Sequence, residues 1–353
     1  MMICRPQPKK IPMRFRSRLG WQNLEDEQLL DLRLCDLPLR IEGTVMEQRV
    51  KRLNDDLAGH DIRLKTHVWL SDEWFSPDGV PGIAIPFYLA HPRLMKLERR
   101  MMHKVEGGTD TECMRILRHE AGHVLDTAFR FHHRRQWREL FGSFAQPYPD
   151  SYKPRASSRN YVLHLDAWYA QVHPAEDFAE TFAVWLTPGS RWRQRYQGWP
   201  ALQKLGYVDQ LVAEIAGTRP QNRRRSKVEP LSEMRLTLRE HYGLKCRHYA
   251  FEWPAAYDRS LRRIFSQTPH DASRPSAATF LRSVSRELSH VVAEETGVHT
   301  YTINQLLQDM MERCRRLHLR LAIPEGQAKR KVSLLLKSQA TNVLNSGYYR
   351  IAV

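Results

Sequence analysis

The amino-acid sequence predicts an α+β fold, with a small sheet packed on helices and a mainly α-helical C-terminal domain. Two short apolar runs bounded by turn residues, Arg63–Leu70 and Gly82–Ala90, predict strands. The segment Thr109–Phe131 has the apolar spacing and the capping residues of one long helix. The C-terminal third alternates helical patterns, such as Ala277–Glu295 and Ile303–Leu321, with clusters of turn residues.

The distribution of charge divides the chain into three parts. The 353 residues carry a formal net charge of +16, and +12 of this charge falls in residues 216–353. We expect residues 1–18 to be a disordered basic lead, residues 19–215 to form a first domain, and residues 216–353 to form a basic, mainly helical second domain. A basic domain can bind nucleic acid. The sequence contains no recognised nucleic-acid motif, however, so a solvated Arg-rich surface is the favoured interpretation.

The cysteines and the N-terminus bear on the cellular compartment. Five cysteines are scattered along the chain without a C-x-x-C pair, which is typical of reduced thiols in a cytosol-like compartment. No apolar run follows the basic N-terminus, and no stretch approaches the roughly 18 apolar residues that a membrane-spanning helix needs. We therefore expect a cytoplasmic protein without a membrane span. The sequence gives no indication of the oligomeric state.

Several elements are predicted ahead of the long helix. Apolar spacing predicts helices within Trp21–Leu39, Thr44–Leu57 and Arg93–Lys104. The strand over Gly82–Ala90 contains Pro86, which has no N–H, so this strand must lie at a sheet edge or contain a bulge. An edge strand at this place could hold an extended substrate peptide by strand addition. A plain buried strand is an equally good interpretation.

The long helix has two chemically different faces. Apolar residues at spacings of three and four form a stripe that faces the core, comprising Leu117, Ala121, Val124 and Ala128. At about 100° per residue, His119, His123 and Asp126 lie on the opposite face. His119-Glu120-Ala-Gly-His123 is an H-E-x-x-H motif, in which both imidazoles can reach one zinc ion. Glu120 is rotated away from the two ligands, so it can contact a zinc-bound water instead of the metal.

A catalytic zinc also needs a third protein ligand and one open position. A third histidine six residues after His123 is excluded, because Phe129 occupies that position. A glutamate from a later helix is the other common solution, and a helix is predicted over Pro174–Leu186. This helix carries Glu176 and Glu180 four residues apart on one face. Two carboxylates beside apolar residues are costly to bury unpaired, and a dication with two imidazoles would satisfy both.

We assign different roles to the two glutamates. Glu176 is expected to bind zinc, and Glu180 to accept the remaining N–H of a ligand histidine. Asp177 and His173 remain alternatives for the third ligand, and Asp126 is a second candidate for the supporting hydrogen bond. Residues 146–159 are rich in proline and serine, and this loop could cover the site or serve only as a connection.

The motifs together resemble the zinc-binding metallopeptidases of the gluzincin type. The resemblance lies in the H-E-A-G-H motif and in H-P-A-E-D-F-A-E-T-F, which starts at His173. W-L-S-D-E-W-F-S-P-D-G, which starts at Trp69, and H-L-D-A-W-Y-A-Q-V, which starts at His164, extend the resemblance over roughly residues 21–215. The Glu-x-x-x-Glu helix departs from the Glu-x-x-x-Asp helix of thermolysin-like enzymes. It is similar to that of lethal-factor-type peptidases, in which the first Glu binds zinc.

In that group a tyrosine seven residues before the ligand glutamate helps to stabilise the oxyanion. The matching residue is Tyr169. The resemblance implies a zincin-like metallopeptidase domain over residues 19–215 with Zn²⁺ as cofactor. The expected function is hydrolysis of peptide or protein substrates by a zinc-activated water, with Glu120 as general base. The alternatives are a non-peptidase zinc amide hydrolase, and a nucleic-acid-binding or scaffold protein with a structural or vestigial zinc site.

Overall fold

A computed structural model describes residues 20–102, 104–149, 152, 155, 158–249, 258–267, 273–298 and 300–345. The predicted basic lead over residues 1–18 lies outside the described residues. The strands are β1 (His67–Ser71) and β2 (Gly82–Pro86). The α-helices are α1 (Asp26–Leu30), α2 (Val45–Ala58), α3 (Pro92–Met102), α4 (Asp110–Phe129), α5 (Arg135–Phe141), α6 (Pro174–Leu186), α7 (Trp192–Arg195), α8 (Ala201–Ile215), α9 (Leu238–Tyr249), α10 (Asp258–Ile264), α11 (Ala277–Thr296), α12 (Thr300–Arg316) and α13 (Glu325–Asn345).

Short 3₁₀ helices link these elements: η2 (Trp21–Asn23), η3 (Leu34–Asp36), η4 (Phe87–Ala90), η5 (Phe131–His133), η6 (Asp166–Gln171) and η7 (Leu231–Glu233). The helix expected within Trp21–Leu39 is therefore three short pieces, η2, α1 and η3. The described chain is mostly helical with a small two-stranded sheet, which agrees with the predicted α+β class.

β1 and β2 pair in parallel, with His67 opposite Gly82 and Ser71 opposite Pro86. The apolar run expected to be a strand through Ala90 leaves the sheet at Pro86 and continues as η4. Every residue of β2 is buried. The strand must end near Pro86 because a proline cannot donate to a sheet ladder.

The second edge of β2 has no free donor for a peptide strand. The N–H of Ala84 donates to the carbonyl of Phe75 at 2.8 Å, and the N–H of Gly82 donates to the carbonyl of Val80 at 2.9 Å. Pro86, two residues further on the same side, has no N–H. This edge therefore lacks the donors that the expected strand addition of a substrate would need, and the plain buried strand is the better description.

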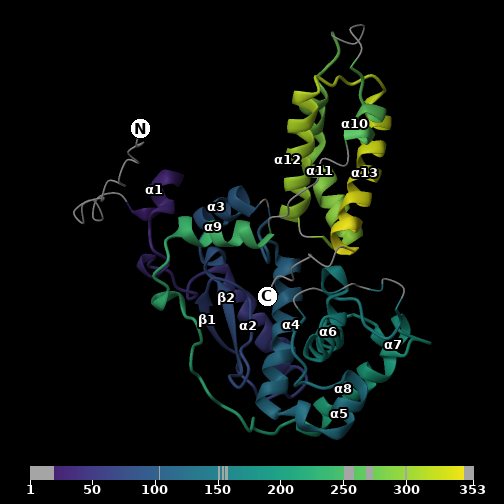
Figure 1. Cartoon of the computed structure of the whole chain (residues 1–353). Coiled ribbons are helices and arrows are strands. Elements are labelled where there is room, and N and C mark those ends of the chain that lie inside the picture. The colour runs from purple at the N-terminus through teal and green to yellow at the C-terminus, as the bar shows by residue number, and fades with distance from the viewer. Residues whose placement is uncertain are drawn as a thin grey trace.

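α4 runs through the middle of the first hydrophobic core, which contains buried residues between Leu29 and Tyr242. It contacts β2 and α2 on one side and α6 on the other (Figure 1). The helix bounds agree closely with the sequence expectation, since Thr109 caps its first turn and the last residue is Phe129. The face of α4 that carries His119 and His123 is thus directed at α6.

Residues 217–229, hereafter the strap, follow α8 and are bound to the first core. The N–H of Gly217 donates to the carbonyl of Asp61, and the N–H groups of Gln221 and Asn222 both donate to the carbonyl of Ala128. Further along, the Trp69 indole donates to the carbonyl of Val228 at 2.9 Å. A segment with the composition of a linker is therefore fixed along the body of the protein.

The first core also extends beyond the expected domain end at residue 215. Leu231, Leu238 and Tyr242 are buried in it, and α9 contacts α1 and α3. Lys245 of α9 makes ion pairs with Glu73 and Glu98. We therefore propose that the division between the two domains lies after α9, and not after residue 215.

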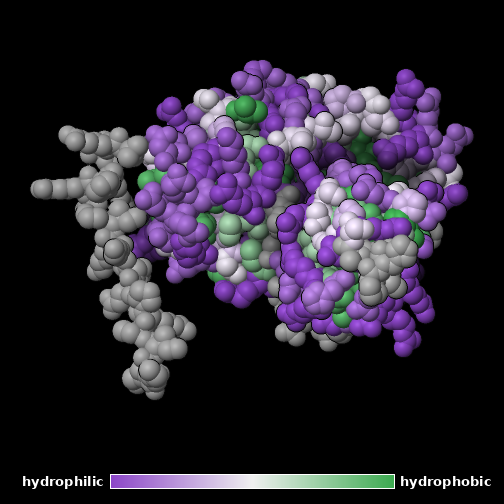
Figure 2. Space-filling model, turned by 90° about the horizontal axis from the view of Figure 1, so that it is seen from above, coloured by the Kyte–Doolittle hydropathy of each residue, from purple (hydrophilic) through white to green (hydrophobic). Residues whose placement is uncertain are grey.

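The helices α10 to α13 surround a second core between Leu261 and Ala340, and they stand together above α6 in Figure 1. α11 contacts η6, so this group of helices reaches the turn that carries Tyr169. Seen from above, the described surface is largely hydrophilic with scattered hydrophobic residues (Figure 2). None of the described helices has the length and apolar character needed to cross a membrane. Within the described residues, the cysteines at 35, 113, 246 and 314 are all free thiols.

Candidate metal centre

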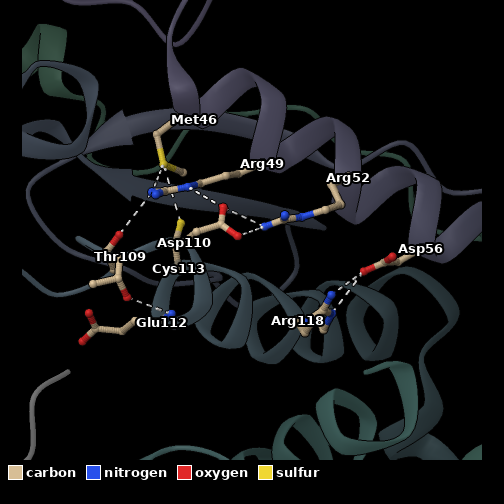
Figure 3. Close-up of polar contacts among 10 residues, drawn as sticks. Met46, Arg49, Arg52, Asp56, Thr109, Asp110, Glu112, Cys113 and Arg118 are labelled. Carbon is tan, nitrogen blue, oxygen red and sulfur yellow. Dashed lines mark hydrogen bonds and ion pairs between the residues drawn. The ribbon is translucent and has the colours of Figure 1, made fainter. Parts of the chain in front are cut away.

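α4 is held in place by its cap and by ion pairs with α2 (Figure 3). The Thr109 hydroxyl accepts from an N–H of the first turn, as the sequence predicts for a capping residue. Asp110 receives two hydrogen bonds from Arg52 at 2.8 and 2.9 Å. Near the motif, the Arg118 guanidinium donates two hydrogen bonds to Asp56 at 3.1 and 2.8 Å. These contacts fix the rotation of α4 and hence the direction of its ligand face.

α6 begins with Pro174, and Nδ1 of His173 accepts from the N–H of Ala175 as the helix cap. The two helices approach closely at Gly122, where a Cβ atom would lie 2.7 Å from Cα of Ala179. Only glycine permits that approach, because any side chain at this position would meet the backbone of α6. The glycine within the H-E-x-x-H motif thus allows α6 to bring its carboxylates to the histidines.

Three side chains converge between these helices. Nε2 of His119 lies 3.1 Å from Nε2 of His123 and 3.0 Å from Oε2 of Glu176. Nε2 of His123 lies 3.3 Å from the same carboxylate oxygen. These residues form the group in the described chain that could hold a metal ion. The predicted ligand set, two histidines and Glu176, is therefore brought together in one place.

The spacing of the three atoms fits a tetrahedral zinc. Ligands about 2.0–2.1 Å from a zinc ion lie about 3.3–3.4 Å apart at the corners of a tetrahedron. The observed separations of 3.0–3.3 Å are close to this value. Two imidazole nitrogens and a carboxylate oxygen are all acceptors, so a proton or a cation must lie among them. Donor type and spacing both suit Zn²⁺.

The close approach of these three side chains also shifts their pKa values. Burial alone would lower the pKa of His119, but its hydrogen bonds to Glu176 and Glu180 outweigh burial and raise it well above the ordinary value. Burial likewise opposes the rise in the pKa of His123, which Glu176 causes. Burial would raise the pKa of Glu176, yet the two histidines hold it well below its usual range. A dication at the centre would replace the protons that these residues share.

Glu180 contacts the ring nitrogen of His119 that does not face the centre. Its Oε1 accepts from Nδ1–H of His119 at 2.8 Å, which leaves the Nε2 lone pair of His119 directed at the centre. Its Oε2 accepts from the N–H of Leu165 at 2.8 Å. The carboxylate is buried and both of its oxygens are used. The hydrogen bond to Leu165 also ties α6 to the start of η6.

Glu120 lies beside the three ligands but does not share their contacts. Its side chain is buried, and Oε2 has no hydrogen-bond partner in the described structure. Its backbone carbonyl accepts from the hydroxyl of Ser76 at 3.3 Å, so the loop after β1 borders the motif. A buried carboxylate oxygen without a partner costs free energy unless a substrate or water supplies one.

Tyr169, expected from the resemblance, lies on η6 next to the centre. Its ring centroid is 5.6 Å from that of His119, with the rings tilted by 59°. The preceding residue, Trp168, has a left-handed backbone with φ 54°. Burial and the nearby Glu176 raise the pKa of Tyr169 well above its ordinary value, so the phenol stays protonated and can donate.

A second tyrosine reaches the centre and was not foreseen. The Tyr148 hydroxyl donates to Oε1 of Glu176 at 2.7 Å, and its ring stacks on His173 at 3.9 Å. Nε2 of His173 donates to the carbonyl of Gln146, which holds this loop over the start of α6. Tyr148 is 53% exposed, and it lies in the loop that was expected either to cover the site or to be a connection. The loop contains two tyrosines, Tyr148 and Tyr152, and nothing in their spacing linked either of them to Glu176.

Three candidate residues have other partners. Asp126 does not support a ligand; it accepts from the N–H and from Nδ1–H of His132, because both residues lie where α4 ends. Asp177 is paired with Lys204 at 2.5 Å, and its pKa is raised by burial to about 7 although Lys204 opposes the rise. His173 caps α6. Asp177 and His173 are therefore directed away from the group that Glu176 forms with the two motif histidines.

Comparison with known proteins bears on this same region. A family model with the description "Putative zinc-binding metallo-peptidase" matches residues 111–188. The match extends from the first turn of α4 to just beyond α6 and includes both motif histidines, Glu120, Tyr148, Tyr169, Glu176 and Glu180. The expected resemblance to zinc-binding metallopeptidases is confirmed for this segment. No curated protein and no solved structure matches the chain.

Proposed function

We propose that this protein is a zinc-dependent metallopeptidase of the gluzincin type with a zincin-like catalytic domain, and that it cleaves peptide bonds in peptides or proteins. His119, His123 and Glu176 would hold the zinc. The observation that carries the proposal is the convergence of their three ligand atoms within 3.0–3.3 Å, with the unpartnered Glu120 carboxylate beside them. The match of the family model to α4 and α6 supports the same assignment.

Bound zinc would polarise the substrate carbonyl and lower the pKa of a coordinated water toward about 7. Glu120 takes a proton from the attacking water on its free Oε2 and later delivers it to the departing amine. Glu180 keeps His119 in the tautomer that presents Nε2. Tyr169, as a protonated phenol beside His119, can donate to the oxyanion that develops on the substrate.

A purely structural zinc site fits the geometry less well. Structural sites are closed by four protein ligands, whereas the described residues contribute three. A structural site also has no use for a buried carboxylate oxygen without a partner, because burying it costs free energy. Both features suit a site where water and substrate complete the coordination.

The metal assignment is tested by zinc analysis of purified protein. The wild type should contain about one zinc per chain, because three protein ligands leave one open position. His119→Ala together with His123→Ala should remove it. Glu176→Ala should lose far more affinity than Glu180→Ala, for which loss of a supporting hydrogen bond predicts about a 10–100-fold effect. Full zinc content in the double histidine variant, or greater loss in Glu180→Ala, would contradict the assignment.

The chemistry is tested with Glu120→Gln, which keeps the shape of the side chain but cannot accept the proton. Zinc should remain, while turnover of a substrate found by a proteome-wide cleavage screen should fall by about 10²–10⁴-fold. Glu112→Gln is the matched control, since Glu112 lies on the same helix and pairs with Lys104. An active Glu120→Gln enzyme would remove the proposed mechanism whatever its metal content.

A further inference from the structure

The strap presents a row of positive charges on the surface of the first domain. Its cations are Arg219, Arg223, Arg224, Arg225 and Lys227, and all of them are exposed. The chain leading into β1 runs alongside the strap, since Gly217 contacts Asp61 and Val228 contacts Trp69. That neighbouring segment adds Arg63 and Lys65, which are also exposed. We call these seven residues the basic face.

The positive charge of this face is not neutralised. Among the described residues, no acid pairs with any cation of the strap, and Arg63 has only Asp61 at 3.9 Å. Arginines elsewhere on the surface commonly have acidic partners, as Arg52 has Asp110 and Arg193 has Asp209. The effect of the uncompensated charge is visible at His67, whose pKa is lowered by burial and further by Arg225 and Lys227.

The cations are also held on a fixed backbone. The N–H groups of Gln221 and Asn222 donate to Ala128, and the Asn222 side chain donates to the carbonyl of Gly79. At the other end, the Ser71 hydroxyl donates to the carbonyl of Glu229 at 2.7 Å. Anchoring at both ends reduces the backbone entropy that a partner must remove on binding. The cations of the strap are therefore preorganised for binding, unlike those of a flexible basic tail.

We propose that the basic face binds the phosphate backbone of a double-helical nucleic acid without reading its sequence. Each strand of a duplex carries one phosphate per about 3.4 Å of helix axis, and the long arginine side chains of the strap can reach several of these phosphates. Guanidinium groups suit phosphate because they donate paired hydrogen bonds. No helix lies within the strap to enter a major groove, so base edges are not read.

The composition of the face favours a duplex over other anions. The strap carries no aromatic side chain, so it lacks the stacking surface that single-stranded nucleic acids use. Val228 is its only large apolar residue, so the strap has little that could enter the lipid of a membrane. The basic face offers closely spaced positive charges, which suit the closely spaced negative charges of a phosphate backbone.

The test is binding of the full-length protein to a labelled duplex of about two helical turns, measured by fluorescence anisotropy over a series of salt concentrations. Arg223→Ala, Arg224→Ala and Arg225→Ala are combined in one variant. A control variant combines Arg263→Ala, Arg282→Ala and Arg286→Ala, which are exposed cations of α10 and α11 with the same change in charge. Zinc content and melting temperature of both variants report whether the fold is intact.

We expect the strap variant to bind more weakly and the slope of log K against log salt to become shallower by about 2.7, because each lost phosphate contact removes about 0.9. The control variant should bind as the wild type does. Equal weakening in both variants would overturn the proposal, since it would indicate diffuse charge. Tighter binding of a single strand, of polyglutamate or of phosphatidylserine vesicles than of the duplex would also overturn it. None of these results depends on peptidase activity.

Discussion

The hydroxyl of Tyr148 donates to Oε1 of Glu176, while Oε2 of the same carboxylate faces Nε2 of His119 and of His123. The two oxygens of the Glu176 carboxylate therefore have different partners. With Oε1 turned to the phenol, Oε2 is the oxygen that Glu176 presents between the two histidines. A single carboxylate oxygen and two imidazoles leave the fourth corner of a tetrahedron for water or substrate.

Replacing Tyr148 by Phe should therefore weaken zinc binding by about 10–100-fold, as loss of a hydrogen bond to a ligand typically does. The ring would still stack on His173, so the loop should stay in place. Competition with a chelator measures the affinity. The visible spectrum of the cobalt-substituted protein reports whether Glu176 has become a two-oxygen ligand, because absorption weakens as the coordination number rises.

Tyr161→Phe is the matched control for this experiment. Tyr161 is also partly exposed, and its ring lies over Lys204 at 4.5 Å instead of contacting a ligand. Its zinc affinity and cobalt spectrum should be those of the wild type. If Tyr148→Phe is equally unchanged, the hydroxyl has no part in holding Glu176, and only the stacked ring matters.

Gly122→Ala should disrupt the centre without altering a ligand. The added methyl would lie 2.7 Å from Cα of Ala179, so α4 and α6 must separate. Overpacking of this kind typically costs about 1–3 kcal/mol, and here it also moves Glu176 away from the histidines. We expect lower thermal stability together with weaker zinc binding. Gly206→Ala is the control, because Gly206 lies within α8 with nothing near its Cβ position, and it should stabilise by up to about 1 kcal/mol. Normal zinc affinity in Gly122→Ala would show that the helix spacing is not critical.

The parts of the site that lie within one helix were predictable. The two motif histidines are four residues apart, and so are Glu176 and Glu180, so helical geometry alone fixes each pair. The spacing did not decide which of the two carboxylates would face a metal; the resemblance to lethal-factor-type peptidases indicated Glu176. Tyr148 could not be foreseen, because its loop has no period and its contact depends on tertiary packing. Asp126 shares the ligand face of α4, but the chain turns there and His132 takes its carboxylate.

The positions of the helices were also predictable from the sequence. The anchoring of the basic segment that follows α8 was not. Apolar spacing located α2, α6 and α11 to within a residue or two. The segment 217–227 is polar and rich in arginine, which is the composition of a linker. It is held instead by its backbone, through hydrogen bonds that any sequence could make. Side-chain composition carries no signal for such contacts.

Acid should weaken the attachment of α9. Burial and the nearby Lys245 lower the pKa of His241 to about 3, below the ordinary 6.5 of an unfolded chain. A lowered pKa means that the stability is present above pH 6.5 and is lost as the pH falls toward 3. The pKa values of Glu73 and Glu98, which burial raises, act in the opposite direction, so a variant is needed to isolate the histidine.

Between pH 7 and pH 5 the wild type should lose about 2 kcal/mol more of its free energy of unfolding than His241→Phe, which cannot take up the proton. Urea denaturation at the two pH values measures the difference. His290→Phe is the control, because His290 is exposed on α11 and pairs only with Glu294. The same pH dependence in His241→Phe and the wild type would mean that His241 is not the group responsible.

The position of the domain boundary can be tested by truncation. A chain of residues 1–249 keeps the strap and α9, while a chain of residues 1–215 loses both. The shorter chain removes Leu231, Leu238 and Tyr242 from the first core. Losing large buried side chains costs about 2–5 kcal/mol each, and domains are stable by only about 5–15 kcal/mol in all. It also leaves Glu98 buried without Lys245.

We therefore expect residues 1–249 to be soluble, to unfold cooperatively and to bind about one zinc, since every proposed ligand and its supporting carboxylate lie within them. Residues 1–215 should aggregate or fail to bind zinc. Circular dichroism melting and zinc analysis of the same samples distinguish these cases. A shorter chain that folds and binds zinc would restore the boundary at residue 215. If the longer chain also failed, the second core would be required for the first to fold, and the contact of α11 with η6 would be the place to look for the reason.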